Sequence, residues 1–150
     1  YIILRYSNLY GPKQSDLGEV GVIRNFIKDY FKKNIITKHG NGKQIRDFLY
    51  IDDAAEATIK SMFYKKNSIF NLTYGSSKSV NYIIDIFKSI LKKNIRFKKK
   101  KFHSGEYYYF RASSNLIKSK LKWRPKTNLK KGIKITINDY LNEKHPRKIL

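Results

Sequence analysis

The hydrophobic positions of the chain follow two spacings, one typical of buried strands and one typical of amphipathic helices. Short apolar runs predict strands, the clearest at residues 2–6, 35–37, 48–51 and 69–73. Apolar residues three and four positions apart predict helices that begin near residues 20, 52, 79, 114 and 129. Strands that alternate with helices are typical of an α/β fold, and the run at residues 2–6 suits a central parallel strand.

The starts of the predicted helices carry capping signals. Asp52 and Asp53 directly follow a predicted strand, and Asp53 and Glu56 have the spacing of a capping box. Ser79 is predicted to cap the next helix in the same way. The helix after Asp53 is expected to turn four apolar residues toward the core, namely Ala55, Ile59, Met62 and Phe63.

The charge of the chain points to an anionic partner but does not identify it. Lys and Arg number 33 against 11 Asp and Glu, a net charge of +22, and such a value favours nucleic acid, acidic membranes or phosphorylated ligands. However, 26 of the 33 are Lys, and Ala is scarce. This composition favours a solvated lysine surface over a dedicated nucleic-acid face. A run of seven Lys or Arg at residues 92–101 is accordingly predicted to be a short strand and loop on a solvated edge.

Composition also removes several classes of protein. The absence of cysteine excludes disulfides, thiolate zinc sites and cysteine nucleophiles, and is compatible with the cytoplasm. No apolar run approaches the roughly 20 residues of a transmembrane helix. Met62 is the only methionine, and the chain opens directly on a predicted strand. We therefore expect it to be the C-terminal part of a larger protein.

No complete catalytic set is visible. His39, His103 and His145 lack metal-ligand spacing, and the sequence has neither a dinucleotide-binding glycine loop nor a P-loop. Tyr140 and Lys144 have the Tyr-x-x-x-Lys spacing that reductases use for proton transfer. Because Tyr140 also continues the apolar face of the last helix, we predict that it is a core residue.

Two loops carry candidate binding residues. Asn8 follows the first strand at its C-terminal end, where α/β sheets place ligands. Residues 40–47 combine a glycine turn with Arg46, whose guanidinium matches phosphate oxygens, and His39 beside the turn can stack on a base. Each also has a structural interpretation: Asn8 as a turn residue, His39 as a surface residue, and Arg46 as the ion-pair partner of Asp47.

Together these segments resemble a known family. Residues 5–12 (RYSNLYGP) are similar to the "R-[YFL]-x-N-x-Y-G-P" segment of extended short-chain dehydrogenases/reductases, which include nucleotide-sugar epimerases and dehydratases such as UDP-glucose 4-epimerase. Residues 40–53 resemble "G-D-G-x-Q-x-R-D-F-x-Y-V-x-D", and residues 70–75 resemble "Y-N-[IL]-G-x-G". Residues 79–80 and 121–125 resemble the "S-V" and "L-G-W-x-P" segments. All five occur in the order that the family shows.

The resemblance implies a fold and a position within it. The expected fold is α/β, comprising the last elements of a Rossmann-type parallel sheet plus a small α/β substrate-binding domain. Residues 1–150 would then be the C-terminal substrate-binding part, with the N-terminal NAD-binding half absent. That half holds the glycine loop and the catalytic Ser/Thr, Tyr and Lys of the family. No catalytic residue is therefore expected in this chain, and the longer protein is expected to form a homodimer through the missing half.

The resemblance also assigns roles to single residues. Ser7 occupies the position that touches the nicotinamide end of NAD. The positions of substrate contacts are occupied by Asn8 (diphosphate), Val22 (start of the helix facing the substrate), Thr37 and His39 (nucleobase slot), and Arg46 (phosphate). The second phosphate-binding arginine of the family aligns with His103, which lacks the guanidinium fork.

The implied function is that of a cytoplasmic enzyme of polysaccharide biosynthesis. We expect the longer protein to be an NAD-dependent nucleotide-sugar epimerase or dehydratase that acts by transient hydride transfer on a UDP- or dTDP-sugar. This chain alone is expected to have no activity and no specific nucleic-acid or membrane partner. Three alternatives remain: a reductase or decarboxylase on the same scaffold, a non-catalytic sugar-nucleotide-binding remnant, and a basic nucleic-acid-binding module.

Overall fold

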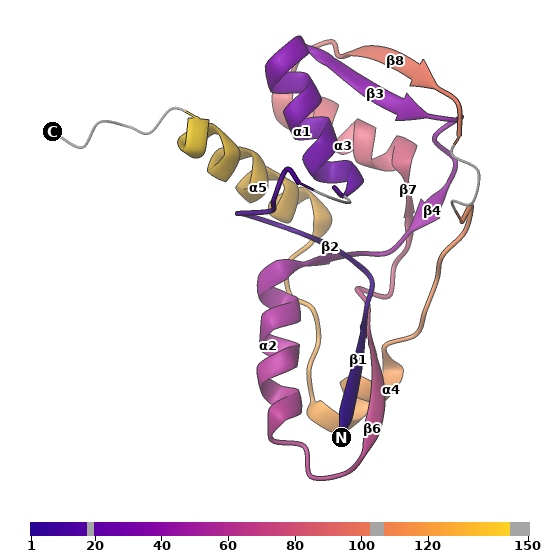
Figure 1. Ribbon diagram of the computed structural model, residues 1–150, viewed down its shortest axis with the longest axis vertical. Helices are drawn as coiled ribbons and strands as arrows, with labels where there is room; N and C mark the ends of the chain where they lie inside the picture. The colour runs from indigo at the N-terminus through magenta and orange to yellow at the C-terminus, as the bar shows by residue number, and fades with distance from the viewer. Residues whose placement is uncertain (18–19, 103–106, 145–150) are drawn as a thin grey trace, which may run out of the picture.

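The computed structural model describes residues 1–17, 20–102 and 107–144 as a mixed α/β structure (Figure 1). Its strands are β1 (Ile2–Tyr6), β2 (Asn8–Tyr10), β3 (Ile35–His39), β4 (Ile45–Arg46), β5 (Phe48–Tyr50), β6 (Ser68–Leu72), β7 (Lys78–Ser79) and β8 (Arg96–Lys100). Its helices are α1 (Val22–Lys33), α2 (Ile51–Met62), α3 (Val80–Leu91), α4 (Asn115–Leu121) and α5 (Leu129–Lys144).

The strands form short pairs, three of them parallel. β1 pairs with β6, β2 with β5, and β3 with β8, all in parallel, whereas β4 and β7 are antiparallel. Parallel strands connected through helices confirm the predicted α/β class. The predicted strand at residues 2–6 is β1, with Ile2 opposite Ser68 and Tyr6 opposite Leu72.

Two hydrophobic clusters divide the molecule into two ends. The first cluster lies among α1, α3 and α5, and includes Phe26, Phe87 and Tyr140. The second cluster lies among β6, α2 and α4, and includes Phe70 and Trp123. Figure 1 shows β1, β6, α2 and α4 at one end, and α1, α3, β3 and β8 at the other. We call these the sheet end and the cavity end.

One predicted cap is confirmed and one is wrong. The Ser79 side chain accepts a hydrogen bond from the Tyr82 backbone N–H at 3.1 Å, as expected at the start of α3. No side chain caps α2, so the capping box of Asp53 and Glu56 does not form. The buried Asp53 carboxylate instead accepts the backbone N–H groups of the segment before α5, at 2.9–3.1 Å. Two backbone donors from a distant segment thus replace the local cap.

The predicted inner face of α2 is also wrong. Ala55, Ile59, Met62 and Phe63 are exposed, the last two by more than 70%. The helix instead buries small side chains, namely Ala54, Ala57 and Ser61. Small residues let α2 approach the sheet closely, and this tight packing leaves the larger apolar residues on the outer face.

Candidate functional site

A cavity of about 990 Å³ lies at the cavity end, within the size range of small-molecule sites. It is bounded by the start of α1, by one face of the β3–β8 pair, by the first residue of β2 and by the last residue of β4. Its lining residues are Asn8, Val20, Gly21, Val22, Asn25, Phe26, Asp29, Lys33, Ile35, Thr37, His39, Gln44, Arg46, Val80, Lys98 and Lys100.

The structure brings five of the predicted site residues together in this cavity. Asn8, Val22, Thr37, His39 and Arg46 all line it, although they come from β2, α1, β3 and β4. Ser7 does not line it and is 9% exposed. Its backbone N–H donates to the Leu72 carbonyl at 3.0 Å, while its buried hydroxyl has no hydrogen-bond partner. His103 lies outside the described residues.

Asp47 positions Asn8 and the loop after β6. Both the backbone N–H and the side-chain amide of Asn8 donate to the Asp47 carbonyl oxygen, each at 3.1 Å. The fully buried Asp47 carboxylate accepts the backbone N–H groups of Tyr74 (2.7 Å) and Gly75 (2.9 Å). Asp47 is therefore an internal connector and not the surface ion-pair partner that one interpretation of Arg46 required.

The glycine turn holds the neighbouring cavity residues against α3. Gly40 and Gly42 have φ values of 62° and 72°, which favour glycine. A Cβ at Gly42 would lie 2.1 Å from the side-chain oxygen of Asn81. The Asn81 backbone N–H donates to the Gly42 carbonyl at 2.9 Å, and the Gln44 side chain donates to the His39 carbonyl at 3.0 Å. These contacts fix the backbone beside His39 at the cavity wall.

Several lining residues were missed from the sequence, among them Gln44, Asn25 and the two lysines of β8. The lysine run was predicted to be a solvated edge, and its residues are indeed exposed. However, Thr37 is paired with Lys98, and His39 with Lys100, across the β3–β8 pair. Successive side chains of a strand point to opposite faces, and this alternation could have shown from the sequence that Lys98 and Lys100 share a face that Lys99 does not.

The charges that line the cavity favour an anionic ligand. Four cationic side chains line it: Lys33, Arg46, Lys98 and Lys100. Asp29 is the single carboxylate among the described lining residues, and it accepts the Thr37 backbone N–H at 3.2 Å. No group of three or more His, Asp or Glu residues that could hold a metal ion occurs in the part of the chain that the structure describes.

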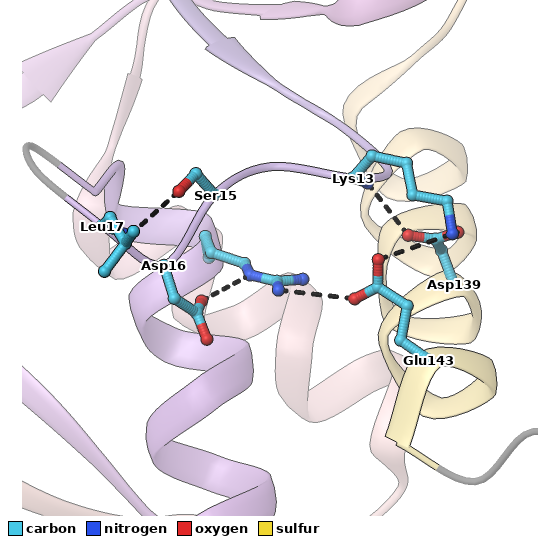
Figure 2. A network of polar contacts seen from close by, with 7 residues as sticks. Lys13, Ser15, Asp16, Leu17, Asp139 and Glu143 are labelled. Atoms are coloured by element: carbon cyan, nitrogen blue, oxygen red, sulfur yellow. Dashed lines mark hydrogen bonds and ion pairs between the residues drawn. The ribbon is translucent and has the colours of Figure 1, made fainter.

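An ion-pair network holds the loop that leads to the cavity wall. The buried Arg24 guanidinium of α1 contacts Asp16 at 2.9 Å and Glu143 at 3.5 Å. Lys13 pairs with both Asp139 and Glu143 of α5, each at 3.5 Å. Figure 2 shows the loop that carries Lys13 and Asp16 lying between α1 and α5, with these contacts as dashed lines. The loop leads toward residues 20–22, which line the cavity.

Tyr140 belongs to the core of the cavity end. It is 2% exposed, and the Arg24 guanidinium lies 4.8 Å from the centre of its ring. Burial, together with the nearby Asp16 carboxylate, raises the pKa of Tyr140. A catalytic tyrosine base needs a lowered pKa, so its environment supports the core interpretation. The described helices include none that is both long and apolar enough to cross a membrane.

The comparisons with known proteins agree with this arrangement. Residues 1–73 match the profile of the NAD dependent epimerase/dehydratase family. A Methanocaldococcus jannaschii relative is 38% identical over 92% of this chain and 45% of its own length. The UDP-glucuronate 4-epimerase of Thermodesulfobacterium geofontis is 33% identical over 91% of this chain and 42% of its own length. The chain thus spans less than half the length of these curated relatives.

Solved structures show the same fold. The UDP-glucose 4-epimerase of Thermotoga maritima, solved with UDP-glucose, has a TM-score of 0.91 at 30% identity, over 97% of this chain and 47% of its own. The UDP-glucuronic acid 4-epimerase of Bacillus cereus, in complex with UDP-glucuronic acid and NAD, has a TM-score of 0.85 at 26% identity, over 95% and 45%. The predicted Rossmann-type architecture and the resemblance are thereby confirmed. The chain belongs to the NAD-dependent epimerase/dehydratase family of extended short-chain dehydrogenases/reductases.

Proposed function

We propose that the cavity binds a nucleotide diphosphate sugar of the UDP or dTDP type, as the substrate-binding part of an NAD-dependent epimerase or dehydratase. The observation that carries this proposal is the cavity itself, where five predicted residues from four separate elements, Arg46 among them, meet beside three lysines. A diphosphate supplies the negative charge that this lining favours.

The residues of the cavity divide into a phosphate part and a base part. In this proposal Arg46 donates a charge-assisted fork to the diphosphate, beside the Asn8 amide that Asp47 orients. The start of α1 at Val22 adds the partial positive charge of a 12-residue helix. Thr37 and His39 form the wall for the nucleobase, and His103 is proposed as a second phosphate contact.

The residues present fit one edge of an NAD site. The Ser7 hydroxyl is a buried polar atom without a hydrogen-bond partner at the C-terminal end of β1, and it suits a polar contact with the nicotinamide end. When bound, NAD supplies hydride acceptance from a sugar carbon and its return. Ser7 would orient that end, and Asn8 and Arg46 would hold the substrate phosphates. We propose no catalytic residue in this chain.

We propose further that residues 1–150 form the C-terminal part of a longer cytoplasmic enzyme, whose N-terminal half binds NAD, carries the catalytic residues and forms the homodimer. Relatives about twice as long support this proposal. So does β1, which pairs only with β6 among the described strands and exposes Ile3 by 45%. An apolar parallel strand of this kind is usually buried on both sides.

Calorimetric titration with UDP, dTDP and uridine tests the proposed function. Because Arg46→Ala removes a charge-assisted phosphate contact worth roughly 1.5–3 kcal/mol, we expect it to weaken UDP binding about ten- to a hundredfold. Lys43→Ala is the matched control, since Lys43 is an exposed cation in the same segment that does not line the cavity. Uridine, without phosphates, should bind Arg46→Ala and the unmodified chain alike. Absence of UDP and dTDP binding, or equal losses in both variants, would reject the proposal.

A further inference from the structure

The lysine run of β8 has two chemically different faces. Lys98 and Lys100 line the cavity, whereas Lys99 and Lys101 do not. All four side chains are exposed; Lys98, Lys99 and Lys100 end the edge strand β8, and Lys101 directly follows it. Alternation along the strand therefore divides four similar lysines into a cavity pair (Lys98 and Lys100) and an outer pair (Lys99 and Lys101).

The strand register places the cavity pair beside residues of the base wall. Lys98 is the partner of Thr37, and Lys100 is the partner of His39. Paired residues on neighbouring strands project from the same face of a sheet. The two ammonium groups are therefore carried on the same wall as Thr37 and His39, on a different strand from Arg46.

No carboxylate neutralises the cavity pair among the residues that the structure describes. The ion pairs of this part of the chain do not include Lys98 or Lys100. Lys33 and Arg46 bring the Lys and Arg side chains of the lining to four, against the single carboxylate of Asp29 among the described lining residues. The cavity lining consequently carries net positive charge.

Exposure determines how these lysines can act. A hydrated ammonium on a flexible stem gives a fixed ligand little orientation, unlike the planar fork of Arg46. However, a cleft lined by one sign of charge concentrates oppositely charged ligands and raises their association rates by about 10- to 1,000-fold in known cases. Such a contribution acts on the rate of capture more than on the rate of release.

We propose that Lys98 and Lys100 form a capture site that draws phosphorylated ligand into the cavity and sets its association rate, whereas Arg46 holds the ligand once bound. This inference rests on the proposed nucleotide-binding function. The competing explanation is that all four lysines only protect an edge strand from pairing with other chains. On that explanation the two faces of β8 are equivalent for ligand binding.

Stopped-flow fluorescence with MANT-labelled UDP separates the two explanations. The variants are Lys98→Gln with Lys100→Gln, and as matched control Lys99→Gln with Lys101→Gln. Both remove two charges from the segment of residues 98–101, and circular dichroism verifies that both fold. At about 0.15 M salt, where the screening length is about 8 Å, we expect association to slow about five- to twentyfold in the first variant and less than about twofold in the control. Dissociation rates should stay within about twofold of the unmodified chain.

The salt dependence of the association rate supplies a second measurement. In the unmodified chain the association rate should fall steeply as salt rises, and near 1 M salt it should approach the rate of the cavity-pair variant. Equal slowing in both double variants, a rate independent of salt, or a loss found in dissociation instead of association would overturn the capture site. Failure of the unmodified chain to bind MANT-UDP or UDP at all would instead overturn the proposed function beneath it.

Discussion

The two ends of the molecule bury similar side chains but expose different ones to solvent. The cavity end encloses its apolar residues among three helices and exposes mainly cations on β8. The sheet end packs Trp123 and Phe70 completely, yet exposes Ile59, Met62 and Phe63 by 57–74%. Isolated exposed apolar residues are common, so a group of them at one helix beside an open strand edge is a candidate contact surface that the predictions below test. The cavity end thus exposes mostly cations on β8, whereas the sheet end exposes a group of apolar side chains at α2.

The largest expected effect is a loss of stability from a change in the interior of the sheet end, with no change in binding at the cavity. Trp123 is fully buried, and its indole N–H donates to the Asp53 carbonyl at 3.1 Å. Trp123→Ala should lower the free energy of unfolding by about 3–5 kcal/mol, measured by urea denaturation. UDP affinity of the folded fraction should be unchanged, because Trp123 does not line the cavity. A loss of affinity in the folded variant would show that the two ends are coupled.

The next prediction tests the outer surface of the sheet end. We expect the 150-residue chain to self-associate through α2 and the open edge of β1. Replacing Met62 and Phe63 together by Glu should weaken self-association about tenfold or more in sedimentation experiments, since both side chains are over 70% exposed. The matched control, Lys99→Glu with Lys101→Glu at the cavity end, should leave self-association nearly unchanged. A stable monomer of the unmodified chain would contradict the contact surface.

A smaller effect is expected where α3 begins, at the cavity end. The Ser79 hydroxyl caps this helix through the Tyr82 backbone N–H. Ser79→Ala should lower the free energy of unfolding by about 1 kcal/mol, measured by thermal and urea denaturation. Ser89→Ala is the control inside the same helix, where the hydroxyl only bonds back to the Ile86 carbonyl at 2.8 Å. If both variants lose the same stability, the cap contributes nothing specific.

The smallest expected effect concerns pH and the loop of Figure 2. Burial of Asp16 opposes ionisation, but its hydrogen bond and charge interaction with Arg24 are stronger together and lower the pKa of Asp16. A lowered pKa in the folded state stabilises above the unfolded value near 4, and the gain is lost as pH falls through the folded pKa. Asp16→Asn should therefore cost about 1 kcal/mol or less at pH 7, and the difference should shrink as the pH falls through the lowered pKa of Asp16. A difference independent of pH, measured by urea denaturation, would rule out this linkage.

Local patterns were sufficient wherever one short segment sets its own structure. The apolar run at residues 2–6 forms β1, and Ser79 caps α3, because strand burial and capping depend on adjacent residues. The apolar face of α5 was predicted equally well, since Ile133, Ile137 and Tyr140 are buried. The family motifs then identified five residues that line the cavity, although no regular spacing along the chain connects these five residues.

Patterns failed wherever a distant segment competes for the same group. Asp53 has the spacing of a helix cap, but two backbone donors before α5 take its carboxylate. The larger apolar residues of α2 were expected inside, yet close packing on the sheet selected Ala54 and Ala57 for the interior. Both outcomes depend on which surface lies against the helix, and helical periodicity carries no information about that surface.

The sequence by itself determined the α/β class, most of the elements and the family. Only the tertiary structure decided which of the many cations line the cavity, because a count of charges does not distinguish the two faces of a strand. The pairing of β3 with β8 places Lys98 and Lys100 on the cavity wall and leaves Lys99 and Lys101 outside. The parallel pairing of these two segments, about sixty residues apart, depends on the packing of the whole cavity end and decides which lysines of the run face the cavity.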